Sequence, residues 1–121
     1  MRTYNFAPWL MFTTLFVTAP VVAGSVEVVD VVARCQQQIC RFDVALKHDD
    51  EGWDHYANQW QVITASGEVI GTRTLHHPHV NEQPFTRSLG SVKIPNGEVE
   101  VFIVPRDSVH GVGDGYPVKL N

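Results

Sequence analysis

Sulfur-containing residues are scarce in this sequence of 121 residues, which has two cysteines and two methionines. Both methionines, Met1 and Met11, fall within the first 23 residues, so the rest of the chain contains no thioether. Thioether and thiolate groups are the ligands that select Cu(I) in proteins. The sequence therefore disfavours a Cu(I) site, provided that the two cysteines are not free.

The two cysteines, Cys35 and Cys40, enclose only four residues and lie between segments rich in β-branched side chains. In an oxidising compartment, two cysteines this close are typical of a structural disulfide. A redox-active or metal-binding pair is the alternative, but the spacing is not Cys-x-x-Cys and no helix start follows it. We therefore predict a disulfide that clips a hairpin.

Basic residues are also few, with nine lysines and arginines against 13 acidic residues. Residues 1–23 contain one arginine and no acidic residue, so residues 24–121 carry a formal charge of −5. Nucleic acids and anionic membrane surfaces are bound through an excess of lysine and arginine. The charge therefore argues against a nucleic-acid partner and against binding to anionic membranes.

An apolar stretch near the start, Phe6–Val17, is shorter than the about 20 residues that span a bilayer. Arg2 precedes it, and Val21 and Ala23 have the small-residue spacing of a signal-peptidase site. We predict a signal peptide over residues 1–23 and an exported domain, periplasmic or secreted, over residues 24–121. A retained anchor is the alternative, but no stable membrane anchor is expected after cleavage, and no cysteine follows the cleavage position for a lipid.

Apolar residues spaced three and four apart are missing, so no helix is expected beyond one turn near Asp54–Ala57. Alternation with a period of two, punctuated by turn residues, instead predicts seven strands. These are residues 25–34, 39–47, 59–65, 68–75, 87–94, 98–106 and 116–120. They indicate one all-β domain, a seven-stranded antiparallel sandwich of the immunoglobulin or fibronectin type III kind, with Trp60 buried in its third strand. The close cysteine spacing favours the fibronectin-like variant.

Successive connections in such a sandwich alternate between its two ends. Three connections are short turns and form one end: Gln36–Gln38, Ser66–Gly67 and Pro95–Gly97. The other three are long and contain all six histidines: His48–Asn58, His76–Thr86 and Asp107–Gly115. We call these two ends the disulfide pole and the histidine pole.

Imidazoles and carboxylates that converge from separate loops are suitable ligands for a borderline divalent ion such as Zn(II) or Cu(II). His77-Pro78-His79 can place two rings on one side of an extended chain, whereas His76 points to the opposite face. We therefore predict His55, His77, His79 and His110 as metal ligands, without His76. The alternative is that the histidines are ordinary loop residues that hold no ion.

Other readings of the histidine pole are open. The acidic run Asp49–Asp54 could supply oxygen ligands to Ca(II), but it lacks the spacing of a recognised calcium loop. The same loops could form the rim of a non-catalytic interaction module that docks a protein, peptide or glycan. The rim residues would be Trp53, Asp54, Tyr56, Glu82 and Asp107. Aromatic residues in such a loop more often fold back over the core, which is what we expect of Trp53 and Tyr56.

A hydrolase is the weakest reading. Ser108 and His110 share a loop with Asp107 and Asp114, but no Gly-x-Ser-x-Gly elbow is present. A nucleophile, a base and oxyanion donors cannot be assembled from these residues. We expect a binding protein and not an enzyme.

Four segments together resemble a set of small exported bacterial proteins of no established function: GWDHYANQWQV, LHHPHVNEQPFTRSL, IPNG and DSVHGVGDGYPV. This resemblance covers nearly all of residues 24–121 and implies export and a sandwich fold, but it assigns no role to any residue. In general design the chain also resembles small periplasmic copper carriers built on a β-sandwich. It departs from them in lacking methionines outside the first 23 residues.

Overall fold

The computed structural model describes residues 25–120, and the predicted signal peptide lies outside the described residues. The described chain contains eight strands and no helix. They are β1 (Glu27–Gln36), β2 (Ile39–Lys47), β3 (Ala57–Thr64), β4 (Val69–Thr74), β5 (Phe85–Lys93), β6 (Glu100–Asp107), β7 (Gly111–Val112) and β8 (Tyr116–Lys119). Within the described residues, no helix is long and apolar enough to cross a membrane.

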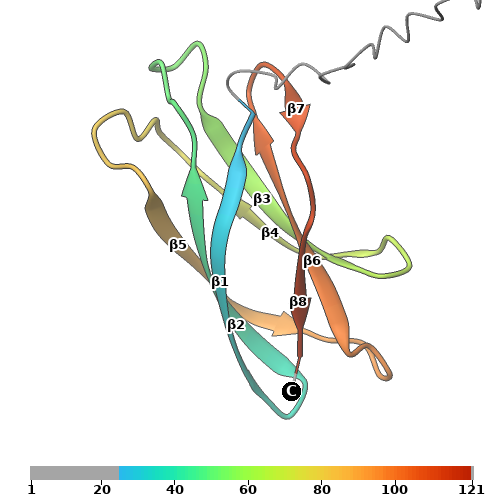
Figure 1. The fold of residues 1–121 in the computed structure, drawn as a ribbon. Coiled ribbons are helices and arrows are strands. Elements are labelled where there is room, and N and C mark those ends of the chain that lie inside the picture. Colours follow the sequence, from blue (N-terminus) through green and yellow to red (C-terminus); the bar gives the residue numbers. More distant parts are fainter. Residues whose placement is uncertain (1–24, 121) are drawn as a thin grey trace, which may run out of the picture.

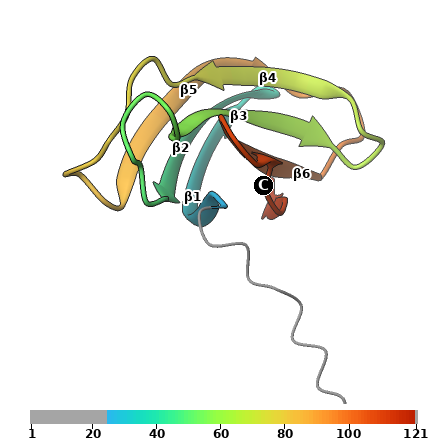
Figure 2. The same cartoon turned by 90° about the horizontal axis from the view of Figure 1, so that it is seen from above.

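The strands form two antiparallel sheets, as the alternation predicted. One sheet has the order β1-β2-β5; the other has the order β4-β3-β6-β7, and β8 also pairs with β6. Seen from above in Figure 2, β4 lies beside β5, and β1 approaches β6 and β8, so the sheets meet along both edges. The all-β class and the antiparallel sheets are confirmed.

Each predicted strand corresponds to an observed one, with bounds that differ by at most two residues. The eighth strand is the two-residue β7, which pairs with the end of β6 before the chain continues to β8. The expected helical turn near Asp54 is instead a hydrogen-bonded turn, in which the backbone N–H of His55 donates to the carbonyl of Gly52 at 3.3 Å. Gly52 has φ 85°, a conformation that glycine adopts without steric cost.

The core follows from strict alternation. In β2 the inward positions are Cys40, Phe42, Val44 and Leu46, all buried, with charged or small residues between them. Trp60 in β3 is fully buried, as predicted, and packs in the same cluster. Burying a large apolar side chain stabilises the fold by about 2–3 kcal/mol, so this cluster is what holds the two sheets together.

The disulfide between Cys35 and Cys40 is present, and these residues are direct register partners in the β1–β2 hairpin. Their Cα atoms are 4.0 Å apart. Figure 1 shows this turn and the β5–β6 connection at one end of the molecule. The β2–β3, β4–β5 and β6–β7 connections lie at the other end, so the histidine pole exists as the strand parity predicted.

Candidate functional site

Three residues of the histidine pole form a buried group that could hold a metal ion: His48, His55 and Asp107. Each offers one ligand atom, and these atoms lie within 4.8 Å of one another. His48 Nε2 is 3.4 Å and His55 Nε2 is 3.5 Å from Asp107 Oδ2. Two ligand atoms bound to tetrahedral Zn(II) at about 2.0–2.1 Å are about 3.4 Å apart, so the two separations from Asp107 fit one ion. Any wider spacing within the group, up to 4.8 Å, would have to shorten on binding.

Strand geometry explains why these side chains meet. His48 directly follows β2 and lies two residues beyond Leu46, so its side chain points to the same buried face. Asp107 ends β6 in the buried phase of Pro105, and it pairs with Ala57 of β3. His55 precedes Ala57 by two residues on the same side. The site therefore lies where the inner faces of the two sheets reach the histidine pole.

A carboxylate orients the first of these histidines. Nδ1 of His48 makes a short hydrogen bond to Oδ1 of Asp50, and both side chains are fully buried. This contact fixes the orientation of the imidazole, with Nδ1 against Asp50. Asp50 therefore leaves Nε2 of His48 directed at Asp107, the arrangement that supports metal-binding histidines in proteins.

Asp50 is itself held by the surrounding backbone. Its Oδ1 accepts a hydrogen bond from the N–H of Ala57 at 3.0 Å, and its Oδ2 accepts one from the N–H of His79 at 2.6 Å. This single carboxylate thus ties the β2–β3 connection to β3 and to the β4–β5 connection. The loop ends are fixed by buried polar contacts and not by apolar packing alone.

The second histidine has an unsatisfied atom. Nε2 of His55 is buried and makes no hydrogen bond of normal length, although it faces Asp107 Oδ2 at 3.5 Å, while its Nδ1 lies 3.7 Å from an exposed carboxylate oxygen of Glu51. A buried polar nitrogen without a partner is costly, since it has given up its hydrogen bonds to water. An ion bound between His55 and Asp107 would satisfy it.

Asp107 is the centre of the group. Its Oδ1 accepts the backbone N–H of Val109 at 2.8 Å and that of His110 at 2.5 Å, and its Oδ2 is 3.1 Å from Nδ1 of His110. Burial raises the pKa of Asp107, but the hydrogen bonds from His110 and Val109 outweigh it, and the pKa lies below its ordinary value. The carboxylate is therefore ionised and gives the pocket a buried negative charge.

The predicted ligands divide between two places. The ring of His110 is 4.9 Å from that of His55, and the side chain of His110 is 32% exposed, so it borders the group on its solvent side. His77 and His79 pair with each other at 4.9 Å and do not belong to the group of His48, His55 and Asp107. His76, expected not to be a ligand, is exposed.

The surroundings of His79 explain its separate role. Its ring stacks on Phe85 at 4.0 Å, and its Nε2 is 2.8 Å from Nη2 of Arg87. Arginine can only donate, so Nε2 must accept and cannot at the same time bind a metal. Burial lowers the pKa of His79, and the positive charge of Arg87 lowers it further. His79 is thus a neutral packing histidine in this structure.

The predicted rim residues also differ in position. Asp107 is 1% exposed and belongs to the interior, whereas Trp53 is 66% exposed and does not cap the core. Tyr56 is half-buried and meets the ring of Trp53 edge to face at 5.7 Å. Asp54 and Glu82 are exposed, as a rim requires.

His48 is the residue that the sequence reasoning missed. The signal was present, because the buried alternation Phe42, Val44, Leu46 extends to position 48. Because the sequence prediction assigns every residue after Lys47 to a loop, it does not follow the alternation as far as His48. The same rule, extended one residue beyond the predicted strand 98–106, marks Asp107 as an interior residue and not as part of a rim.

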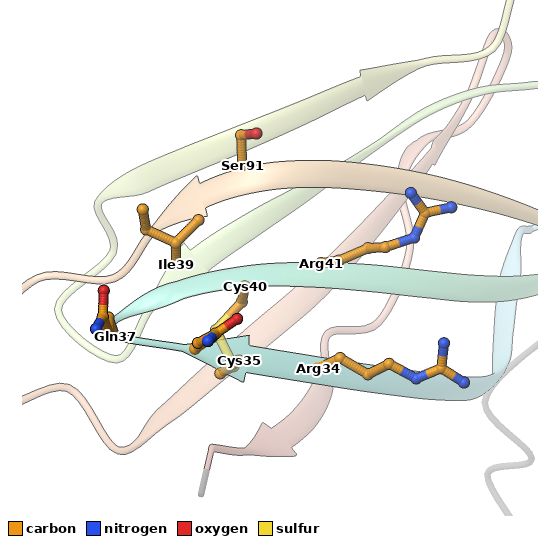
Figure 3. Close-up of a pocket in the computed structure, with 8 residues that line it drawn as sticks. Arg34, Cys35, Gln37, Ile39, Cys40, Arg41 and Ser91 are labelled. Carbon is orange, nitrogen blue, oxygen red and sulfur yellow. A yellow bond between two sulfur atoms is a disulfide. The ribbon is translucent and has the colours of Figure 1, made fainter.

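The disulfide pole has a hollow of its own, with a volume of about 580 Å³. It is lined by Arg34, Cys35, Gln36, Gln37, Ile39, Cys40, Arg41 and Ser91. Figure 3 shows Arg34 and Arg41 extended side by side along β1 and β2, next to the disulfide. No histidine or carboxylate lines this hollow, so it offers no site for a divalent metal.

No family model and no solved structure matches the sequence. A curated protein of Halomicrobium mukohataei, named "Putative lipoprotein", is 44% identical to it over 72 residues. The match covers 60% of this chain and 35% of that protein, so it spans about a third of the relative's length. The relative's name states no activity, which agrees with the resemblance to proteins of no established function. The match does not test the four sequence segments that carry that resemblance.

Proposed function

We propose that this protein is a small exported β-sandwich that binds one divalent transition-metal ion, Zn(II) or Cu(II), through His48, His55 and Asp107. The buried Nε2 of His55, which makes no hydrogen bond of normal length and lies 3.5 Å from Asp107, is the observation that carries the proposal. The donor set of two imidazoles and one carboxylate suits these ions. The described residues contain no methionine, and both cysteines are bridged, so soft ligands for Cu(I) are missing from this part of the chain.

His110 supplies the fourth side of the site. Its Nδ1 lies 3.1 Å from Asp107 Oδ2, and in the tautomer with the proton on Nε2 its lone pair would be free to bind the ion. Three protein ligands with an open fourth position would leave room on a bound ion for a water molecule or another exchangeable ligand. The proposed role is limited to binding, and Ser108 has a structural contact in it: its Oγ accepts the N–H of Tyr56 and joins two loops.

Export and fold type are supported by separate observations. The relative is named a lipoprotein, and the Cys35–Cys40 disulfide fits an oxidising compartment. In immunoglobulin constant domains the first, second, fifth and fourth strands share a sheet. Here β4 pairs with β3 in the other sheet, which supports the fibronectin-like variant.

Isothermal titration of the purified protein with Zn(II) and Cu(II) tests the proposal. We expect one ion per chain, and a loss of affinity of about tenfold or more in His55→Gln and Asp107→Asn, because each removes a ligand. His76→Gln, an exposed histidine of the same pole, is the matched control and should leave affinity unchanged. Circular dichroism shows whether each variant is folded.

Two results would contradict the proposal. One is the absence of binding heat for the folded parent protein. The other is an equal loss of affinity in His76→Gln and His55→Gln, which would mean that the ion is held by exposed histidines and not by the buried group.

A further inference from the structure

The histidine pole exposes apolar side chains around its metal-binding group. Trp53 of the β2–β3 connection is 66% exposed, and Val109 and Val112 near β7 are 58% and 68% exposed. Apolar side chains grouped on a surface can mark an interaction site, and tryptophan is enriched among the residues that dominate protein interfaces. We call Trp53, Tyr56, Val109 and Val112 the apolar rim.

Hydrogen bonds join the two loops that carry the apolar rim. The N–H of Ser108 donates to the carbonyl of Tyr56 at 2.9 Å, and the N–H of Tyr56 donates to Oγ of Ser108 at 3.0 Å. These two hydrogen bonds fasten the turn that carries Val109 to the loop that carries Trp53. Tyr56 supports the Trp53 ring edge to face, so the rim is held in place before any partner arrives.

The long connections that carry the rim have acidic residues and no basic residue of their own, although Arg87 of β5 is paired with Glu82 at 3.4 Å. The three long connections of the pole, residues 48–56, 75–84 and 108–115, contain no lysine and no arginine. Their exposed carboxylates are Asp49, Glu51, Asp54, Glu82 and Asp114. The side chain of Glu51 is 72% exposed, so it is available to a partner. A negative surface attracts cationic partners and repels acidic proteins, nucleic acids and anionic membranes.

We infer that the apolar rim docks a basic, amphipathic segment of a partner protein, with Trp53 as its anchor. Apolar side chains of the segment would pack on Trp53 and Val109, and its lysines or arginines would pair with Glu51 and Asp54 or lie over the indole face. A neutral glycan would leave the carboxylates unused, which is why a basic polypeptide fits this face better. The inference rests on exposure and charge and does not depend on the metal-binding proposal.

Fluorescence anisotropy with synthetic peptides, at near-physiological salt and without added metal, tests this inference. The probe is a labelled peptide of alternating lysine and leucine, compared with matched peptides in which glutamate replaces lysine or serine replaces leucine. We expect binding of the lysine–leucine peptide alone, because it offers both the charge and the apolar face. Amide chemical shifts should change at residues 51–56 and 108–112.

Variants locate the surface. Trp53→Ala should weaken binding about tenfold, the size typical of an interface anchor. Val32→Ala, an exposed apolar residue of β1 outside the pole, should not change it. The inference is overturned if Trp53→Ala binds like the parent, if the lysine–serine peptide binds equally well, or if the rim instead buries itself in a dimer seen by sedimentation.

Discussion

The two ends of this sandwich are closed by different chemistry. At the disulfide pole a covalent bond joins β1 to β2, and turn hydrogen bonds complete the closure, such as Ile94 N–H to the carbonyl of Gln38 at 2.8 Å. At the histidine pole the same task falls to buried ionisable side chains. Of the six buried polar or charged residues described, Thr64 lies at the disulfide pole, and the other five lie at the histidine pole. These five are His48, Asp50, His55, His79 and Asp107.

This difference indicates where function resides. A disulfide or an apolar cluster closes a sandwich at little electrostatic cost, whereas burying imidazoles and carboxylates carries a desolvation penalty. Buried atoms without a hydrogen bond of normal geometry include Nε2 of His55 and Nδ1 of His79 at this pole, and also Nε1 of Trp60 and Nε of Arg73 on β3 and β4. Arrangements that cost stability in one region and not in another are typical of sites kept for binding. The disulfide pole is therefore scaffold, and the histidine pole is where a ligand is expected.

The largest expected effect is on Asp107, because it joins the two loops of the histidine pole. Asp107→Ala should lower the free energy of unfolding by about 3 kcal/mol or more without metal, since it leaves two amides and the imidazole of His110 without their common acceptor. Asp114→Ala removes an exposed carboxylate of the same pole and should change stability by less than about 0.5 kcal/mol. Urea denaturation measures both, and equal values would show that the buried group does not hold this end together.

Removing the disulfide should lower the free energy of unfolding less than Asp107→Ala does, and it should leave metal binding unchanged. The bond closes a short loop, for which the chain-entropy model gives about 2 kcal/mol. The double variant Cys35→Ala, Cys40→Ala should lose about this much stability in urea and keep the parent's affinity for Zn(II). A comparable loss of affinity would mean that the two poles are coupled and that the division into scaffold and site is wrong.

A smaller effect is expected from pH. Because the pKa of His79 is lowered in the folded protein, the unfolded chain binds a proton more readily below about pH 6.5. Stability attributable to His79 is therefore complete above that pH and is lost as the pH falls toward the folded-state pKa. Denaturation midpoints at pH 7.5 and 5.5 measure the loss, which should shrink in His79→Gln. An unchanged slope in that variant would assign the pH dependence to other groups.

The smallest expected effect on stability is that of Trp53→Ala. The side chain is 66% exposed and contacts Tyr56 only at an edge, so the change should lie within about 0.5 kcal/mol. Thermal unfolding of the variant beside the parent measures it. A loss near that of a core residue would mean that Trp53 caps the fold after all and is not available to a partner.

The strands could be predicted from the sequence because buried and exposed residues alternate along them, as at the buried positions Phe42, Val44 and Leu46. The hairpin disulfide followed from the spacing of Cys35 and Cys40, and the histidine pole followed from strand parity. These features depend on local patterns along the chain. They also place His55 and His110 near each other, as the structure confirms with a ring separation of 4.9 Å.

The composition of the ligand group was not accessible in the same way. His48 is selected by the direction of its ring and by Asp50, and both depend on how the β2–β3 connection folds back on β3. His79 occurs in a suggestive His-Pro-His run, but Phe85 and Arg87 from β5 engage its ring. Such contacts are tertiary, and spacing in the sequence does not encode them.

Anomalous X-ray scattering from crystals of the Zn(II)-loaded protein tests the central claim most directly. The account predicts one strong peak within about 2.1 Å of His48 Nε2, His55 Nε2 and Asp107 Oδ2, the bond length of zinc to nitrogen and oxygen ligands. A peak between His77 and His79, or no peak at the buried group, would contradict it.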